Sequence, residues 1–126
     1  MEMAPLPGHD RQIVHGYGKG GFKVADHDWN GAIIVLPART LSWGVSGVAD
    51  LVLAAFAPIR EADDPPIELL LIGTGAKLAL LPAQLRSDLR ALGLSIEVMD
   101  TGAACRTFNL LVSEERRVAA ALLPVG

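Results

Sequence analysis

The sequence predicts a single α/β domain, in which an antiparallel β half precedes a half that alternates strands and helices. In the first half, short apolar runs are separated by turns rich in glycine and aspartate, a pattern typical of hairpins. The second half follows the order strand–helix–strand–helix–strand, and such units make parallel neighbours through right-handed crossovers. With 126 residues, 51% of them hydrophobic, the chain has the size of one domain and the material for its core.

The N-terminal part divides into a tail and about four short strands. Residues 1–11 carry prolines and charges without periodicity, so we expect a flexible tail and place the single domain at residues 12–126. Apolar or alternating runs predict the strands, with connections of hairpin length between them. We expect strands at residues 13–17, 22–24, 32–36 and 40–45, and a turn at residues 26–31.

The next segment leads to a buried strand. For the apolar residues 48–56 we expect a short helix that ends at Pro58, although an apolar strand has a similar pattern. The run at residues 67–72 is interrupted only by Glu68, as expected for a strand that is buried on both faces. A Gly73-Thr74-Gly75 turn follows it directly.

Two amphipathic helices complete the alternating half. Pro82 suits the first turn of a helix, and Gly93 suits a left-handed end to it. Asp100 or Thr101 can cap a second helix, which lies between strands expected at residues 94–99 and 118–123. The apolar stripes expected on these helices are Leu81, Leu85, Leu89 and Leu92 on the first, and Ala104, Phe108 and Leu111 on the second.

Charge and composition exclude several classes of protein. The net charge of −3 argues against a nucleic-acid partner, which would need a clustered positive field. Cys105 is the single cysteine, so no intramolecular disulfide is possible and a reducing, cytoplasmic setting is the simpler expectation. The first residues carry no secretion signal, and no uncharged apolar stretch has the length of a membrane span.

Two glycine motifs resemble functional signatures but have simpler explanations. Residues 16–21 have the spacing G-x-G-x-x-G of dinucleotide sites, yet no helix is expected after them, so a glycine-rich hairpin is the better interpretation. Asp100-Thr101-Gly102 resembles the aspartic-protease signature, but helical residues follow where the protease would continue as a strand. Helix capping therefore explains the motif better.

Three further features of the sequence allow both a functional and a structural interpretation. Cys105 lies in the first turn of a helix, where the helix dipole can lower a thiol pKa, but we favour a packing role for this small side chain. The sequence Asp26-His27-Asp28 lacks a second ligand cluster, so a solvated turn is a better account than a metal site. Trp29 and Trp43 could each belong to the core or to a partner-binding surface.

A candidate ligand site lies at the ends of two neighbouring strands. If these strands are parallel, the Gly73-Thr74-Gly75 and Asp100-Thr101-Gly102 loops open at the same edge of the sheet, where ligands of open α/β sheets bind. The alternative is that the glycines only allow two tight turns. The candidate ligand-binding residues are Gly73, Thr74, Gly75, Asp100, Thr101, Cys105 and Arg106.

These motifs, taken in order, resemble a known family. It is the domain of unknown function that is shared by bacterial and archaeal proteins, the mitochondrial complex I assembly factor 3 and the adipogenesis-associated domain protein. The resemblance covers about residues 13 to 123 and implies a three-layer α/β fold with a mixed central sheet and no established reaction. The motifs that carry it are Tyr17-Gly18, Gly21-Phe22, Gly31, Ile34-Val35, Pro37, Trp43, residues 68–75, Asp100-Thr101, residues 104–109 and residues 114–116.

The sequence is consistent with two functions. The resemblance, together with the lack of an acid–base pair or nucleophile constellation, favours a non-catalytic protein-interaction or assembly-factor-like domain with a protein partner. The alternative is a small-molecule or anion-binding domain, possibly an enzyme, with its site at the carboxyl ends of the central strands. We expect no cofactor, no metal, no nucleic acid and no membrane insertion. The absence of the Arg- and Ser-rich leader of the mitochondrial relatives leads us to expect a bacterial, cytoplasmic protein.

Overall fold

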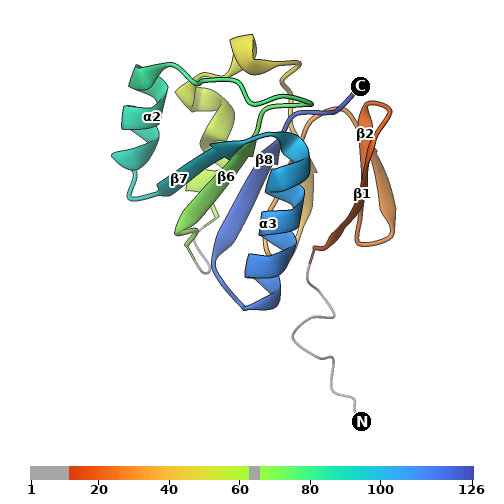
Figure 1. The fold of residues 1–126 in the computed structure, drawn as a ribbon. Coiled ribbons are helices and arrows are strands. Elements are labelled where there is room, and N and C mark those ends of the chain that lie inside the picture. The colour runs from red at the N-terminus through yellow and green to blue at the C-terminus, as the bar shows by residue number, and fades with distance from the viewer. Residues whose placement is uncertain (1–11, 63–65) are drawn as a thin grey trace.

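The fold consists of two β-sheets and several helices (Figure 1). The computed structural model describes residues 12–62 and 66–126, so the tail expected at residues 1–11 lies outside the described residues. In chain order the strands are β1 (Val14–Gly18), β2 (Gly21–Val24), β3 (His27–Asn30), β4 (Ile33–Val35), β5 (Thr40–Ser42), β6 (Leu69–Gly73), β7 (Ser95–Met99) and β8 (Val118–Leu122). The helices are η2 (Val48–Asp50), η3 (Leu53–Phe56), α1 (Ala57–Arg60), α2 (Ala83–Arg90) and α3 (Thr101–Ser113).

The larger sheet is mixed and has the strand order β5-β4-β8-β6-β7. Strand β6 pairs in parallel with both β7 and β8, whereas β4 runs antiparallel to β8 and to β5. Helix α2 connects β6 to β7, and α3 connects β7 to β8. The predicted β-α-β-α-β half and the mixed central sheet are therefore confirmed.

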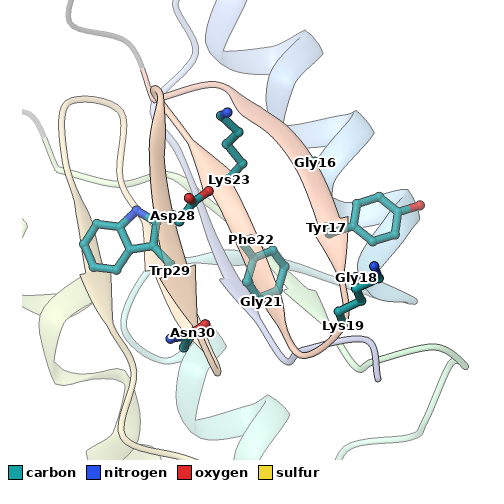
Figure 2. A pocket seen from close by; sticks show the side chains of 10 residues that line it. All are labelled: Gly16, Tyr17, Gly18, Lys19, Gly21, Phe22, Lys23, Asp28, Trp29 and Asn30. Carbon is teal, nitrogen blue, oxygen red and sulfur yellow. The ribbon is translucent and has the colours of Figure 1, made fainter.

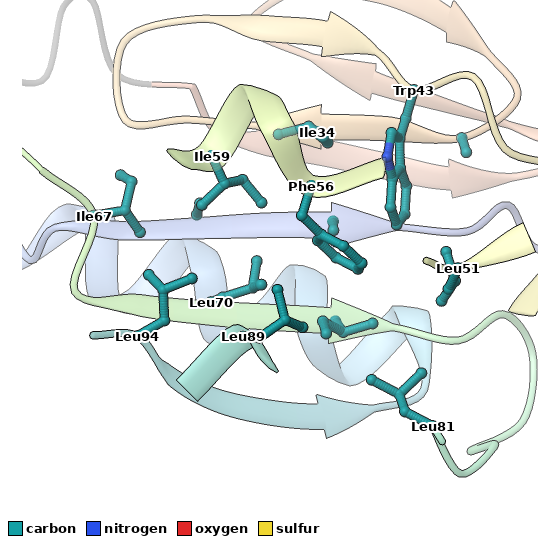
Figure 3. Close-up of a cluster of buried hydrophobic side chains, with 14 of the residues drawn as sticks. Ile34, Trp43, Leu51, Phe56, Ile59, Ile67, Leu70, Leu81, Leu89 and Leu94 are labelled. Atoms are coloured by element: carbon teal, nitrogen blue, oxygen red, sulfur yellow. The ribbon is translucent and has the colours of Figure 1, made fainter. Parts of the chain in front are cut away.

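The central sheet is covered on both faces, which gives the fold three layers. One buried cluster includes residues of η3, α1 and α2 and contains Leu70 and Ile72 of β6 (Figure 3). The other includes residues of α3 and the three-stranded sheet β1-β2-β3 and contains Leu71. Because successive side chains of a strand point to opposite faces, the apolar run of β6 fills both clusters. The expectation that this strand is buried on both faces is confirmed.

Trp43 is a core residue. Its side chain is 6% exposed, and its ring meets the Phe56 ring edge to face, with centroids 5.3 Å apart. The indole Nε1 donates a hydrogen bond of 2.7 Å to the carbonyl of Ala55. The polar atom of this buried ring is therefore satisfied, as a buried indole requires.

The prediction of a turn at residues 26–31 is wrong. Only Ala25 and Asp26 form the turn, and both have positive φ, 49° and 69°. Two such residues make the tight hairpin turn whose twist matches that of the flanking strands. Strand β3 therefore starts at His27 and pairs with β2, although its side chains are mostly exposed. Residues 14–42 thus contain five strands, and β4 and β5 belong to the central sheet.

The single helix predicted at residues 48–56 is also wrong. Two short 3-10 helices, η2 and η3, replace it, with Val52 extended between them (φ −123°, ψ 164°). Pro58 does not end this segment but lies in the first turn of α1, where its missing N–H costs no hydrogen bond. The burial of Leu51 and Phe56 in one cluster outweighs the weak helical preference of the run.

Helix α2 follows its predicted pattern with one exception. Leu81, Leu85 and Leu89 are buried, but Leu92 is 39% exposed because the helix ends at Arg90. Gly93 has a φ of +89°, the left-handed conformation expected for it.

Candidate functional site at the carboxyl edge of the central sheet

The two predicted loops lie side by side. Strands β6 and β7 are parallel, with Gly73 opposite Met99, so the loops that follow them share one edge of the sheet. The amide of Thr101 donates to the carbonyl of Gly75 at 2.9 Å, and the amide of Gly75 donates to Thr101 Oγ1 at 2.8 Å. The loops are therefore joined directly by hydrogen bonds.

Thr101 ties together the ends of three strands. Its side chain is fully buried, and its hydroxyl donates to the carbonyl of Leu123 at 2.7 Å while it accepts from Gly75. A Cβ at Gly73 would come within 2.9 Å of the Thr101 Cα, so glycine is required for this close approach. The hydroxyl of Thr101 is thus engaged inside the protein.

Thr74 organises the loop that leads to α2. It is 8% exposed, and its hydroxyl accepts from the amide of Ala79 at 3.0 Å and donates to the carbonyl of Lys77 at 2.8 Å. Side-chain bonds of this kind hold a turn in one conformation. The hydroxyl of Thr74 is therefore also engaged internally.

The Asp100-Thr101-Gly102 motif begins helix α3. Asp100 Oδ1 accepts from the amide of Ala103 at 2.9 Å, so the predicted helix cap is confirmed for Asp100. A Cβ at Gly102 would collide with the hydroxyl end of the Tyr17 side chain. Each residue of the motif therefore has a structural role, because Asp100 caps the helix, Thr101 ties the strands and Gly102 leaves room for Tyr17.

Cys105 and Arg106 point to different environments. Cys105 is 2% exposed and belongs to the cluster between α3 and the central sheet, as the packing interpretation requires. Burial raises the pKa of its thiol from 9.0 to about 12, and the smaller opposing effect of the Arg106 charge does not reverse this. Of the seven candidate residues, five are buried, and Asp100 and Arg106 reach solvent.

A shallow hollow lies elsewhere, on the three-stranded sheet (Figure 2). Its volume is about 380 Å³. Three of the residues that line it are glycines: Gly16 and Gly18 of β1, and Gly21 of β2, which is paired with Gly18. The glycine motif at residues 16–21 forms the β1–β2 hairpin, so the hairpin interpretation is confirmed. The hollow is not predicted from the sequence, although the spacing of Gly16 and Gly18 places both on one face of a strand.

The described part of the chain offers neither a cluster of metal ligands nor a membrane-spanning helix. Within residues 12–62 and 66–126, no group of three or more His, Cys, Asp or Glu side chains could hold a metal ion. None of the helices in those same ranges has the length and apolar character needed to cross a membrane.

Residues 14–123 match the family described as "Protein of unknown function (DUF498/DUF598)". The chain belongs to this family. A family relative from Danio rerio, named NADH dehydrogenase (ubiquinone) 1 alpha subcomplex assembly factor 3, is 37% identical over 89% of this chain and 64% of its own length. The chain therefore spans less than two thirds of that relative. An uncharacterised protein from Rhodobacter capsulatus is 40% identical over 89% of this chain and 84% of its own.

Solved structures of similar proteins have the same fold. A crystal structure from Bartonella henselae, described as an outer membrane protein, has a TM-score of 0.83 and 40% identity, and the match covers 92% of this chain and 97% of that one. A solution structure from Bordetella pertussis, described as an Mth938-like domain, has a TM-score of 0.79 and 33% identity, with 98% and 92% covered. The predicted family and α/β fold class are confirmed.

Proposed function

We propose that this chain is a non-catalytic protein-interaction domain with an assembly-factor-like role, and that it acts in the cytoplasm of a bacterium. The observation that carries the proposal is the 37% identity, over 89% of the chain, to a protein named as an assembly factor. Proteins that promote assembly act through contacts with other proteins, so the partner of this chain is a protein.

The state of the candidate residues supports a non-catalytic role. A nucleophile or general base must reach the atom on which it acts. The hydroxyls of Thr74 and Thr101 are bonded to backbone groups of the protein itself. The thiol of Cys105 is buried and, with a pKa of about 12, is protonated at neutral pH. These three groups therefore serve the fold.

The test is purification of the full chain from its native host at its natural level, followed by mass spectrometry of everything that it retains. We expect at least one protein to be retained reproducibly and in near-stoichiometric amount. Recovery of a small molecule bound to the chain, without any reproducible protein, would contradict the proposal.

Small-molecule or anion binding is the second candidate function. The observation that favours it is a pair of solvent-reaching charges beside the joined loops: Asp100 precedes α3, and the Nη1 of Arg106, within α3, would lie 3.3 Å from a Cβ at Gly102. Native mass spectrometry of the purified chain with a library of small anions tests it. We expect an adduct that is lost in Arg106→Ala and kept in Arg116→Ala, an exposed arginine just beyond α3. An adduct that survives both substitutions would exclude this site.

A further inference from the structure

The loop between β6 and α2 presents two leucine side chains to solvent. We call residues 76–82 the leucine loop. Leu78 is 59% exposed and Leu80 is 83% exposed, whereas Leu81 is 4% exposed and belongs to the core. Large apolar side chains this exposed are unusual when they occur together, and a gathering of them marks a site of interaction.

The leucine loop is held in place from within. The buried hydroxyl of Thr74 is bonded to both Lys77 and Ala79, which brackets Leu78. At its other end, Leu81 is packed in the core and Pro82 immediately precedes the first residue of α2. These contacts hold the loop in one conformation, and in that conformation Leu78 and Leu80 are exposed to solvent. A surface that is ordered before binding loses little conformational entropy when it docks.

A third exposed apolar residue comes from the segment between η2 and η3. Val52 is 58% exposed and follows Leu51, which lies in the same buried cluster as Leu81. Figure 3 shows Leu51 and Leu81 at the same end of that cluster, the end toward which β6 runs. Val52 therefore adjoins, along the chain, a core residue at that end of the cluster.

Shape, area and charge indicate what covers this surface. Leu80 is 83% exposed, and apolar side chains that contribute most to binding usually fill a pocket of the partner. The apolar area is on the order of a few hundred Å², below the roughly 800 Å² per partner of a stable complex, so the leucine loop forms only part of the contact with its partner. Lys77 is the one charged residue of the leucine loop, so acidic groups around the partner pocket would complement it.

We propose that the leucine loop docks into a concave apolar pocket with an acidic rim on a protein partner. This inference rests on the proposed interaction function and names the surface and the chemistry through which it acts. Leu80 is the central side chain of the contact, and Lys77 fixes its orientation at the rim.

Site-specific photo-cross-linking in the native host tests the assignment. Benzoylphenylalanine replaces Leu78, Leu80 or, as a control, Leu110 of the full chain, and mass spectrometry identifies the cross-linked peptide. Leu110 is a matched control because it is 58% exposed and lies on α3. We expect positions 78 and 80 to cross-link one protein at a peptide with apolar residues and nearby Asp or Glu, and position 110 not to do so.

Substitutions give a second, independent measurement. Leu78→Ser with Leu80→Ser should lower recovery of that partner about tenfold or more, whereas Leu110→Ser should leave it unchanged. Lys77→Glu should lower recovery and Lys77→Arg should restore it. Circular dichroism should show unchanged melting of all variants, because the replaced side chains lie at the surface.

The outcomes separate this inference from the function on which it rests. If position 110 cross-links a protein partner and positions 78 and 80 do not, the interaction function stands and the leucine loop is the wrong surface. If positions 78 and 80 cross-link lipid, a second copy of this chain or a basic segment, the assigned partner chemistry is wrong. If no position cross-links a protein although purification retains one, the leucine loop is the wrong surface; if purification also retains no protein, both proposals fail.

Discussion

Thr101 is the residue on which the joined loops depend most. Replacement of Thr101 by valine keeps the shape of the side chain but leaves the buried amide of Gly75 and the carbonyl of Leu123 without a partner. We expect the free energy of unfolding to fall by about 2–4 kcal/mol. Chemical denaturation measures it, and Thr107→Val on the same helix is the control. An equal loss in the two variants would refute the assigned role.

Glycine at position 73 is required by the close approach of α3 to β6. An alanine Cβ there would press on backbone and side-chain atoms of Thr101 and on Leu122, and the backbone cannot move aside cheaply. We expect Gly73→Ala to destabilise the protein by about 1–3 kcal/mol. Gly16→Ala, in β1, meets nothing within 4 Å and should be neutral or slightly stabilising in the same melting experiment.

The thiol of Cys105 makes stability depend on pH in alkaline solution. Because burial raises its pKa from 9.0 to about 12, the unfolded chain releases the proton before the folded one does. The contribution of the protonated thiol to the free energy of unfolding is present below pH 9 and is lost as the pH rises from about 9 to about 12. Unfolding titrations should show a smaller loss of the free energy of unfolding over this range in Cys105→Ala.

A thiol reagent at pH 8 should modify Cys105 only after denaturation, and rapid modification of the native protein would contradict its burial.

Among the helices and strands, the sequence predicts correctly those whose residue pattern agrees with their burial and contacts in the fold. Strand β6 is a continuous apolar run because both of its faces are buried, and Asp100 caps α3 through its own side chain. The conformation of residues 48–60 differs from the predicted helix because packing of Leu51 and Phe56, not local propensity, sets it. The position of the joined loops can be predicted because it follows from the parallel pairing of β6 and β7. The hydrogen bond from the Thr101 hydroxyl to the carbonyl of Leu123 cannot, because the two residues are far apart in the sequence.

Strand β3 escapes prediction because neither residue of its hairpin turn is glycine or asparagine. Ala25 and Asp26 both have positive φ, a conformation that Asn-Gly adopts at much lower cost. We therefore expect Ala25→Asn with Asp26→Gly to raise the free energy of unfolding by about 1 kcal/mol. Ala38→Asn, at an exposed loop position, should change it little. No gain over this control in thermal melts would mean that the turn is not strained.

At the scale of the whole molecule, α3 joins the two sheets. It packs against β6 and β8 on one side, and on the other the amide side chain of Asn109 is bonded to β1. Asn109 Oδ1 accepts from the amide of Val14 at 2.9 Å, and its Nδ2 donates to the carbonyl of the same residue at 2.9 Å. The amide thus takes the place of a neighbouring strand along β1.

This arrangement predicts that the three-stranded sheet can open as a unit. In Asn109→Leu both bonds to β1 are lost, so we expect faster hydrogen exchange throughout β1 and β2, while β6 and β8 keep their protection. Asn109→Asp keeps the acceptor and loses the donor, so its effect should be intermediate. Uniformly faster exchange in all strands would show instead that the two sheets unfold together. Opening confined to β1 and β2 would identify the central sheet and α3 as the stable part of the molecule, the part that holds the leucine loop in position.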